Sequence, residues 1–121
     1  MIYLASPYTH PDPAVREARY HAACAATAAM IRDGKTVYSP IVNSHVLVEH
    51  GLPTDWESWA RFDRDIIRRC DSLLVLMLDG WSNSVGVRAE EGIATACGIP
   101  IGYIHPTTLL GVPVTNLEAV L

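Results

Sequence analysis

The sequence predicts a single α/β domain in which helices cover a parallel β-sheet, and three observations support this fold class. Short apolar runs alternate with helix-like stretches along the chain. The run at 72–78, SLLVLML, is continuously apolar, which is typical of a strand covered on both faces. The chain has 121 residues, half of them hydrophobic, which suffices for one packed core. We therefore expect one domain over residues 1–121 and a parallel sheet of roughly four to five strands.

The first half of the chain contains two expected strands and one long helix. The helix begins at Pro13, with Asp12 as its N-cap, and ends before Gly34, a residue type suited to the end of a helix. Residues 41–53 are expected to form a connecting loop that could include a helical turn. The two expected strands are residues 2–6 and 36–40.

The second half continues the alternation. Thr54 and Glu57 match a capping box, which predicts a helix from residue 55 to about residue 70. A third helix is expected to end near Cys97, before a glycine. The apolar end of the chain, LEAVL, could be a final helix or a subunit contact. The two further strands are residues 72–78 and 99–104.

Composition excludes several functional classes. The net charge is −4 without a cluster of Lys and Arg, so a nucleic-acid polymer is not an expected partner. No apolar run approaches the roughly 18–20 residues that cross a membrane, and the first residues lack the features of a signal peptide. Three cysteines without CxxC spacing indicate reduced thiols in a cytoplasmic protein. We expect neither a metal nor a cofactor.

Polar residues follow three of the expected strands. The carboxyl ends of parallel strands meet at one edge of a sheet, where ligands bind. The segments SPYTH, SPIVNSH and DGWSNSVG all reach that edge, and each contains serine with glycine, asparagine or histidine. The sequence therefore predicts a polar pocket there. Its candidate residues are Ser6, His45, Trp81, Ser84 and Gly86.

Two adjacent glutamates are separated by their angular positions on the third helix. Glu91 lies opposite the apolar stripe, so we expect it in solvent. Glu90 lies on the flank of the stripe, in line with Gly86, at the edge of the core. From the residues alone, a surface charge and a site carboxylate are equally open for Glu90. The stripe expected to be buried consists of Val85, Ala89, Ile93, Ala96 and Cys97.

Two aspartates are further candidates. Asp63 interrupts the apolar stripe of its helix, between Trp59 and Ile67. Asp71 ends the same helix, where the helix dipole disfavours negative charge. The alternatives are that Asp63 pairs with a neighbouring arginine and that Asp71 caps the chain. Several carboxylates and hydroxyls around one pocket suit glycoside chemistry, in which one carboxylate attacks the anomeric carbon and another handles protons.

Four motifs together resemble the nucleoside 2-deoxyribosyltransferase-like superfamily, in particular its short bacterial and phage members. They are IYLASPY, W-x-x-x-D at 59–63, Cys-Asp before an apolar strand, and GW-x-x-S-x-G-x-x-x-E at 80–90. The resemblance runs from residue 2 to about residue 104. It implies a flavodoxin-like or Rossmann-like three-layer domain. It also implies cleavage of the N-glycosidic bond of (deoxy)nucleosides or their 5′-monophosphates, with transfer of the sugar to another base or to water.

The resemblance implies a role for several residues. Glu90 matches the nucleophile that attacks C1′ and forms a glycosyl-enzyme intermediate. Asp71 matches a catalytic aspartate that handles the sugar or a proton. Asp63 matches a residue that contacts the substrate, and Tyr3 matches an aromatic residue that lines the site. Asn116 and its neighbours could reach the site of another subunit.

Two loop residues are candidates for contact with the substrate base. Trp81 lies at the mouth of the expected pocket and is a better stacking candidate than Trp59, which we expect in the core. His45 could contact the base or the sugar, although a loop histidine is more often structural.

Ser84 bears on the choice of substrate. Transferases that act on free nucleosides commonly carry an acidic residue six positions before the nucleophile, whereas a serine resembles the branch that hydrolyses monophosphates. A hydroxyl and the free N–H groups of a helix start can hold a phosphate, which a carboxylate would repel. Ser84 could equally be only the N-cap of the helix. Transfer and hydrolysis both stay open.

A second functional class is a non-catalytic module that binds or senses a nucleotide on the same fold. The fold does not separate the two classes. Glu90 favours the enzyme, because a phosphate-binding module gains nothing from a carboxylate beside its anion. In either case we expect a small nucleoside or nucleotide as partner, and a homodimer or larger homo-oligomer.

Overall fold

A computed structural model of the chain describes residues 1–113 and confirms the α/β class. Four parallel strands form a sheet in the order β2-β1-β3-β4. The apolar end LEAVL, for which a final helix and a subunit contact were both open, and Asn116 lie outside the described residues. Among residues 1–113, no helix is both long and apolar enough to cross a membrane. The strands are β1 (Ile2–Ala5), β2 (Val37–Tyr38), β3 (Ser72–Leu76) and β4 (Ile101–Ile104).

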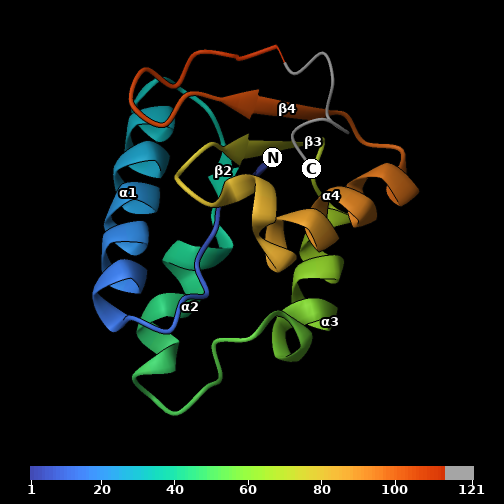
Figure 1. The fold of residues 1–121 in the computed structure, drawn as a ribbon. Helices are drawn as coiled ribbons and strands as arrows, with labels where there is room; N and C mark the ends of the chain where they lie inside the picture. The colour runs from blue at the N-terminus through green and yellow to red at the C-terminus, as the bar shows by residue number, and fades with distance from the viewer. Residues whose placement is uncertain (114–121) are drawn as a thin grey trace.

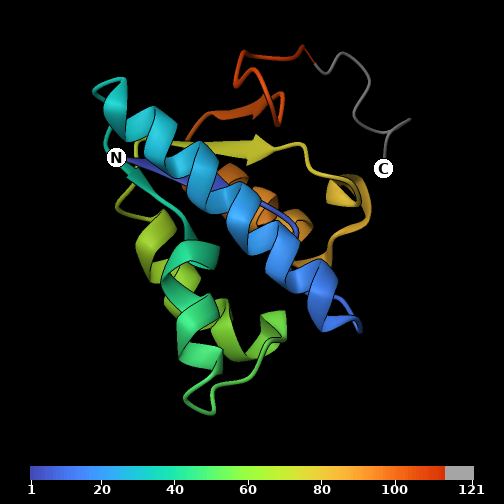
Figure 2. The ribbon, with the colours of Figure 1, turned by 90° about the vertical axis from the view of Figure 1, so that its left-hand side faces the viewer.

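Helices cover both faces of the sheet, which gives the three layers of a flavodoxin-like or Rossmann-like domain (Figure 1). One face is covered by α1, which runs along it (Figure 2). The other face is covered by α3 and α4, and α2 packs beside α1. The helices are α1 (Pro13–Arg32), α2 (Pro40–Val48), α3 (Trp56–Ile67) and α4 (Val85–Cys97), with a short 3-10 helix η1 (Trp81–Asn83) before α4.

Side-chain caps fix where the helices begin. The Asp12 carboxylate accepts a hydrogen bond from the backbone N–H of Ala14, as expected for the N-cap of α1. The N-cap of α3 is Asp55, which accepts from the N–H of Ser58, so the capping box predicted one residue earlier is wrong in its position. Gly98 ends α4 in a left-handed conformation with φ of 73°.

Helix α2 occupies residues that we expected to form a loop. The Ser39 hydroxyl accepts a hydrogen bond from the N–H of Val42 at 3.2 Å, and Pro40 occupies the first helical position. Serine followed by proline is a common helix start, because proline already has a helical φ and needs no N–H donor there. The apolar side of this helix packs on α1 through Ile41.

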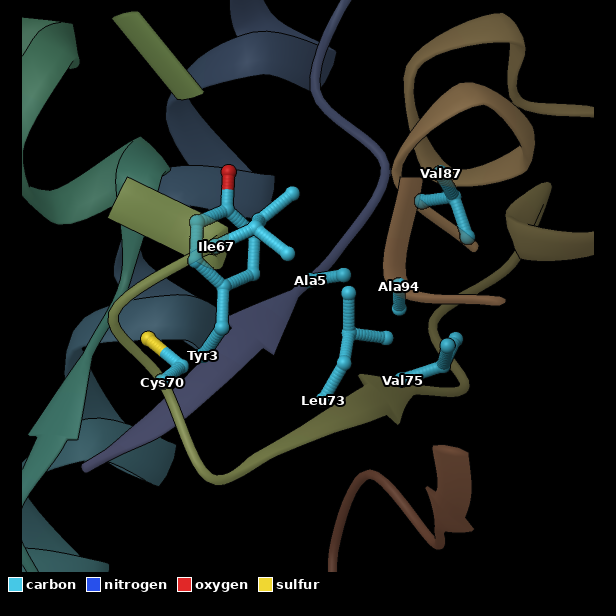
Figure 3. Packing of buried hydrophobic residues seen from close by; sticks show 8 residues of the cluster. All are labelled: Tyr3, Ala5, Ile67, Cys70, Leu73, Val75, Val87 and Ala94. Atoms are coloured by element: carbon cyan, nitrogen blue, oxygen red, sulfur yellow. The ribbon is translucent and has the colours of Figure 1, made fainter. Parts of the chain in front are cut away.

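The two faces of the sheet carry separate cores. Figure 3 shows the larger core, in which Tyr3 rises from β1 beside Ile67 with its hydroxyl directed away from the strand. This core lies between the sheet and the helices α3 and α4. The core on the α1 face consists of Leu4, Ala26, Met30, Leu76 and Ile104.

The strand order places a crevice between β1 and β3. From these two central strands the chain leaves toward opposite faces of the sheet, into α1 after β1 and into α4 after β3. In such sheets the loops diverge at the carboxyl ends and leave room for a ligand. At the far edge, residues after β4 turn back, with an antiparallel bridge between Ile104 and Gly111 and a 2.8 Å hydrogen bond from the N–H of Val112 to the carbonyl of Tyr103.

Candidate functional site

A cavity of about 60 Å³ lies at the carboxyl end of β1, enclosed by the following loop and by α2, α3 and the start of α4. It brings together five of the residues predicted for the site. They come from three segments that are far apart in the sequence, which shows that the fold, and no single motif, builds this cavity. The five residues are Ser6, Asp63, Ser84, Gly86 and Glu90.

Glu90 lies on the inner side of α4 and is only 4% exposed. The hydroxyl of Tyr3, which is fully buried, donates a hydrogen bond to one of its carboxylate oxygens. Among the described residues no Lys, Arg or His forms an ion pair with Glu90. Burial raises the pKa of Glu90 well above its ordinary value, and the hydrogen bond from Tyr3 opposes this shift.

Asp63 is a second buried carboxylate at the same cavity, 5% exposed on α3. Burial raises its pKa to about 7, partly offset by the Tyr3 hydroxyl. The charge of Asp63 in turn helps to raise the pKa of Glu90. The alternatives stated from the sequence do not hold for either residue. Glu90 is buried and is not a surface charge. Asp63 forms no ion pair with an arginine within residues 1–113. Two carboxyls and one phenol therefore form a coupled acidic group.

Glu91 is not solvated, and the expectation from helix counting is wrong. It is 8% exposed, and the hydroxyl of Tyr103 on β4 donates a hydrogen bond to it. Helix α4 is turned so that its carboxylates face inward, while Val85 at the start of the predicted stripe is 73% exposed. Tyrosine hydroxyls on β1 and β4 supply partners for both carboxylates, which makes this orientation possible. The buried residues of α4 are Val87, Glu90, Glu91 and Ala94.

Asp71 lies at the wrong edge of the sheet for the expected catalytic role. It immediately precedes β3, at the amino end of the strands, whereas the cavity lies at the carboxyl end. Its side chain is 87% exposed and accepts a hydrogen bond from the terminal ammonium of Met1 at 2.5 Å. That hydrogen bond lowers the pKa of Asp71. The alternative stated from sequence, a structural role at the chain turn, describes its surroundings better.

Trp81 was expected at the mouth of the pocket and Trp59 in the core, and the structure shows the reverse for the cavity. Trp81 packs against Tyr103, with ring centroids 5.4 Å apart, and does not line the cavity. Trp56 and Trp59 on α3 line it instead. The indole N–H of Trp59 donates to the carbonyl of Pro53 at 2.7 Å, which fixes its ring at the cavity wall. The spacing of these two residues, three apart on one helix, was a usable signal for a shared face.

Ser84 begins α4 and has the capping role that we considered. Its hydroxyl accepts a hydrogen bond from the N–H of Val87 at 3.2 Å while it also lines the cavity. Ser6, which follows β1, lines the same cavity and is 4% exposed. The Ser6 hydroxyl has no hydrogen-bond partner among the described residues. A buried hydroxyl without a partner is costly, so Ser6 is available to bind a ligand in the cavity.

His45 lies behind the cavity wall rather than in the cavity. One ring nitrogen bonds the hydroxyl of Tyr8, which does line the cavity, and the other bonds the carboxylate of Glu17 on α1. Sequence reasoning missed Tyr8, although it belongs to the SPYTH segment that was expected at this edge. Among residues 1–113 no group of three His, Cys, Asp or Glu side chains could hold a metal ion.

Arg19 connects two of the loops at the carboxyl ends of the strands by hydrogen bonds. It donates to the backbone carbonyls of Thr9, in the loop after β1, and Asp79, in the loop after β3, both at 3.1 Å. Gly80 approaches this guanidinium so closely that a Cβ would lie 2.8 Å from Arg19 Nη2, and its φ is 91°. The positive φ is the reason that glycine is favoured there, because the end of the flexible Arg19 side chain could move away from a Cβ.

Comparison with known proteins gives one match. The sequence model of a family described as "Domain of unknown function (DUF1937)" matches residues 1–105. This range contains the four strands, the covering helices and every residue that lines the cavity. A search of curated proteins finds no match to the chain.

Proposed function

The chain belongs to the family described as "Domain of unknown function (DUF1937)", and from its site we propose that it cleaves the N-glycosidic bond of (deoxy)nucleosides or their 5′-monophosphates. The activity is that of a nucleoside 2-deoxyribosyltransferase-like enzyme, with transfer of the sugar to another base or to water. One observation carries the proposal. Glu90 is a buried carboxylate that lines a cavity, receives a tyrosine hydroxyl and has no cationic partner within residues 1–113.

The electrostatics of this carboxylate suit a reaction that develops positive charge. A buried carboxylate without a counter-charge is unfavourable in the free protein. Glycoside cleavage places positive charge on the sugar ring in its transition state, and a nearby carboxylate stabilises that charge. The interaction is therefore stronger in the transition state than in the ground state, which is the requirement for catalysis.

In the proposed reaction, Glu90 attacks C1′ of the sugar. Tyr3 holds one carboxylate oxygen and the other forms the bond to C1′. The bond between C1′ and the base nitrogen breaks, and its electron pair leaves with the base. A water molecule or a second base then attacks C1′ and loses a proton to solvent, while the bond from C1′ to the Glu90 oxygen breaks and its electron pair returns to the carboxylate. Asp63, with a pKa of about 7, exists in both protonation states near neutral pH and can donate to or accept from a sugar hydroxyl.

The other cavity residues suit the two ends of a nucleotide. The free N–H groups at the start of α4, with Ser84 and the unpartnered Ser6 hydroxyl, offer donors to a 5′-phosphate or a 5′-hydroxyl. Trp56 and Trp59 offer aromatic surface to a base. This division of the cavity follows from the chemistry of its residues.

The cavity must widen to admit a nucleoside, since ligand pockets commonly measure roughly 300–1,000 Å³ and this one measures about 60 Å³. The segment best placed to move is the connection between α2 and α3, whose residues 49–53 are exposed. Two side-chain hydrogen bonds attach it to the cavity wall. They run from Thr9 Oγ1 to the Thr54 carbonyl and from Trp59 Nε1 to the Pro53 carbonyl.

The test is release of free base from a panel of deoxynucleosides, ribonucleosides and their 5′-monophosphates, followed by chromatography with and without an acceptor base. We expect release from at least one substrate and loss of release in Glu90→Ala. Glu91→Gln is a matched control, because it changes the neighbouring buried carboxylate outside the cavity.

The outcomes separate the two functional classes. Release that persists in Glu90→Ala would overturn the role of this residue. Binding of a monophosphate by calorimetry without release of base from any substrate would favour a non-catalytic nucleotide-binding module. A new nucleoside in the presence of the acceptor base would identify a transferase, and free sugar or sugar phosphate would identify a hydrolase.

A further inference from the structure

A chain of three side chains leads from the surface to the cavity. Glu17 on α1 bonds Nε2 of His45 at 2.8 Å, and Nδ1 of His45 bonds the hydroxyl of Tyr8 at 2.8 Å. Glu17 is about half exposed, the His45 side chain is 12% exposed and Tyr8 is 8% exposed. Tyr8 lines the cavity. The polar contacts therefore run from a half-exposed carboxylate to a residue that lines the cavity.

The partners decide the protonation of the histidine ring. Glu17 can only accept when it is ionised, so Nε2 of His45 carries the hydrogen. In neutral His45 the Nδ1 atom is then an acceptor, and the Tyr8 hydroxyl donates to it. When His45 is protonated, Nδ1 donates to the Tyr8 oxygen, and the hydroxyl hydrogen of Tyr8 is free for another acceptor.

We propose that Tyr8 is the catalytic proton donor to the leaving base and that His45, oriented by Glu17, supplies the proton to Tyr8. This inference rests on the proposed function. The resemblance assigned the handling of a proton to Asp71, which lies at the opposite edge of the sheet. The Tyr8 chain provides such a group at the cavity itself.

The position of Tyr8 suits a donor. Its ring packs with Ala23 on α1 and Ile41 on α2, whereas Glu90 and Asp63 come from α4 and α3. A nucleophile and a leaving group occupy opposite faces of the sugar carbon, so the donor to the base is needed on the wall away from Glu90. Asp63 interacts with the same Tyr3 hydroxyl as Glu90, so its carboxyl lies close to the proposed nucleophile.

The step balances in protons and electrons. Glu90 forms its bond to C1′ as the bond from C1′ to the base nitrogen breaks, and the electron pair of that bond passes to the base. The base takes the hydroxyl proton of Tyr8, and the Tyr8 oxygen takes the Nδ1 proton of His45. His45 is left neutral, still donating from Nε2 to Glu17, and regains a proton from solvent.

The charged and aromatic groups around His45 come from α1 and from the end of α2. On α1, Glu17 bonds its ring and Tyr20 stacks on it, with ring centroids 4.1 Å apart. His21, also on α1, bonds the other oxygen of Glu17 at 3.0 Å. Arg16 on α1 lies near Tyr8, and Glu49 at the end of α2 acts on both Tyr8 and Tyr20.

The first test compares two leaving groups. Tyr8→Phe keeps the ring and removes the hydroxyl. With a natural deoxynucleoside or its monophosphate we expect base release to fall about 100-fold or more, in the range of general acid catalysis. With p-nitrophenyl 2-deoxyriboside or its 5′-phosphate, whose leaving group needs no proton, we expect less than about threefold loss. Equal losses on both substrates would overturn the proposal and assign Tyr8 to structure or binding.

The second test uses the pH profile of kcat. His45→Asn keeps an amide near Nδ1 to bond Tyr8 but does not titrate. In the wild type, release of the natural base should fall as rising pH deprotonates His45, and His45→Asn should lose this fall. His50→Asn, an exposed histidine on the α2–α3 connection, is the matched control and should leave the profile unchanged.

Failure of this proposal is distinguishable from failure of the proposed function. If the wild type releases no base from any substrate, the glycosidase function fails and the proton route fails with it. If the wild type releases base and depends on Glu90, but His45→Asn keeps the wild-type pH profile, only the proton route is overturned.

Discussion

Glu90 and Glu91 are neighbours in the sequence and both are buried, yet only one belongs to a site. Each accepts a hydrogen bond from a tyrosine hydroxyl, Tyr3 for Glu90 and Tyr103 for Glu91. Glu90 faces the central strand β1 and lines the cavity, whereas Glu91 faces the edge strand β4. The two glutamates therefore have similar hydrogen-bond partners, but only Glu90 also lines a cavity.

The comparison teaches that burial alone does not identify a functional carboxylate. The pair of Tyr103 and Glu91 is a satisfied polar contact that joins α4 to β4, which is an ordinary structural use of a buried charge. Glu90 has the same kind of partner and, in addition, a second carboxyl nearby and a cavity in front of it.

The largest difference is expected from amide substitution of the two glutamates. Glu90→Gln removes the nucleophile while it keeps the size of the side chain, so we expect kcat for base release to fall by about 10³-fold or more. Glu91→Gln should lower kcat by less than about threefold. Thermal unfolding of both variants shows whether the fold is intact. If both variants fold and lose similar amounts of kcat, Glu90 is not distinguished from Glu91 as the site residue.

The second effect concerns stability against pH. Asp63 has a pKa of about 7 in the folded protein and an unfolded value of about 3.9. Between these values the folded state binds more protons, so its contribution to stability is complete below about pH 4 and is lost as the pH rises through 7. This decline in the free energy of unfolding has an upper limit on the order of 4 kcal/mol. Asp63→Asn should make the decline smaller.

Urea unfolding of wild type and Asp63→Asn between pH 4 and 8 measures this difference. Glu91→Gln serves for comparison and should retain the decline, because it leaves the pair of Asp63 and Glu90 in place. A decline of the same size in wild type and Asp63→Asn would contradict the shifted titration.

The two tyrosines give the third comparison. Tyr3→Phe removes the hydrogen bond that favours ionised Glu90, so we expect a fall in kcat of roughly 10- to 100-fold, the equivalent of one hydrogen bond to a charged group. The pH at which Glu90 becomes active should also rise, because this hydrogen bond holds its pKa down. Tyr103→Phe should change kcat by less than about threefold. Steady-state kinetics across pH measures kcat and its pH dependence in both variants. An unshifted pH profile in Tyr3→Phe would contradict the role of Tyr3 in holding down the pKa of Glu90.

The smallest effect tests the start of the helix that carries both glutamates. Ser84→Asp keeps an N-cap of similar quality but adds negative charge beside the cavity. We expect KM for a 5′-monophosphate to rise about tenfold through repulsion, while KM for the free nucleoside stays within about threefold. If both values of KM change together, Ser84 serves α4 alone.

Much of the fold follows from local patterns in the sequence. The apolar run at 72–78 and the cap at Asp12 predict β3 and α1 close to their observed bounds. The main error is α2, where Ser39 and Pro40 form a helix start that we did not recognise. These features depend on neighbouring residues, and for that reason sequence reasoning can reach them.

The site was less predictable because it depends on partners that are distant in the sequence. Helix counting gives the angle between Glu90 and Glu91 but not the face that the sheet covers, and Tyr103 accounts for the burial of Glu91. The position of Asp71 before β3 already placed it at the amino end of the strand, which a closer reading of the topology could have found. The contact of His45 with Tyr8 needed the unexpected helix α2.

The turn that follows β4 also bears on how the protein behaves at high concentration. An outermost strand exposes unpaired backbone groups on which another chain can add a strand and begin aggregation. Here the returning segment bonds Tyr103 and Ile104 through Val112 and Gly111, so part of that edge is already occupied by the chain itself. Residues 111 and 112 thus protect this part of the β4 edge from intermolecular strand addition.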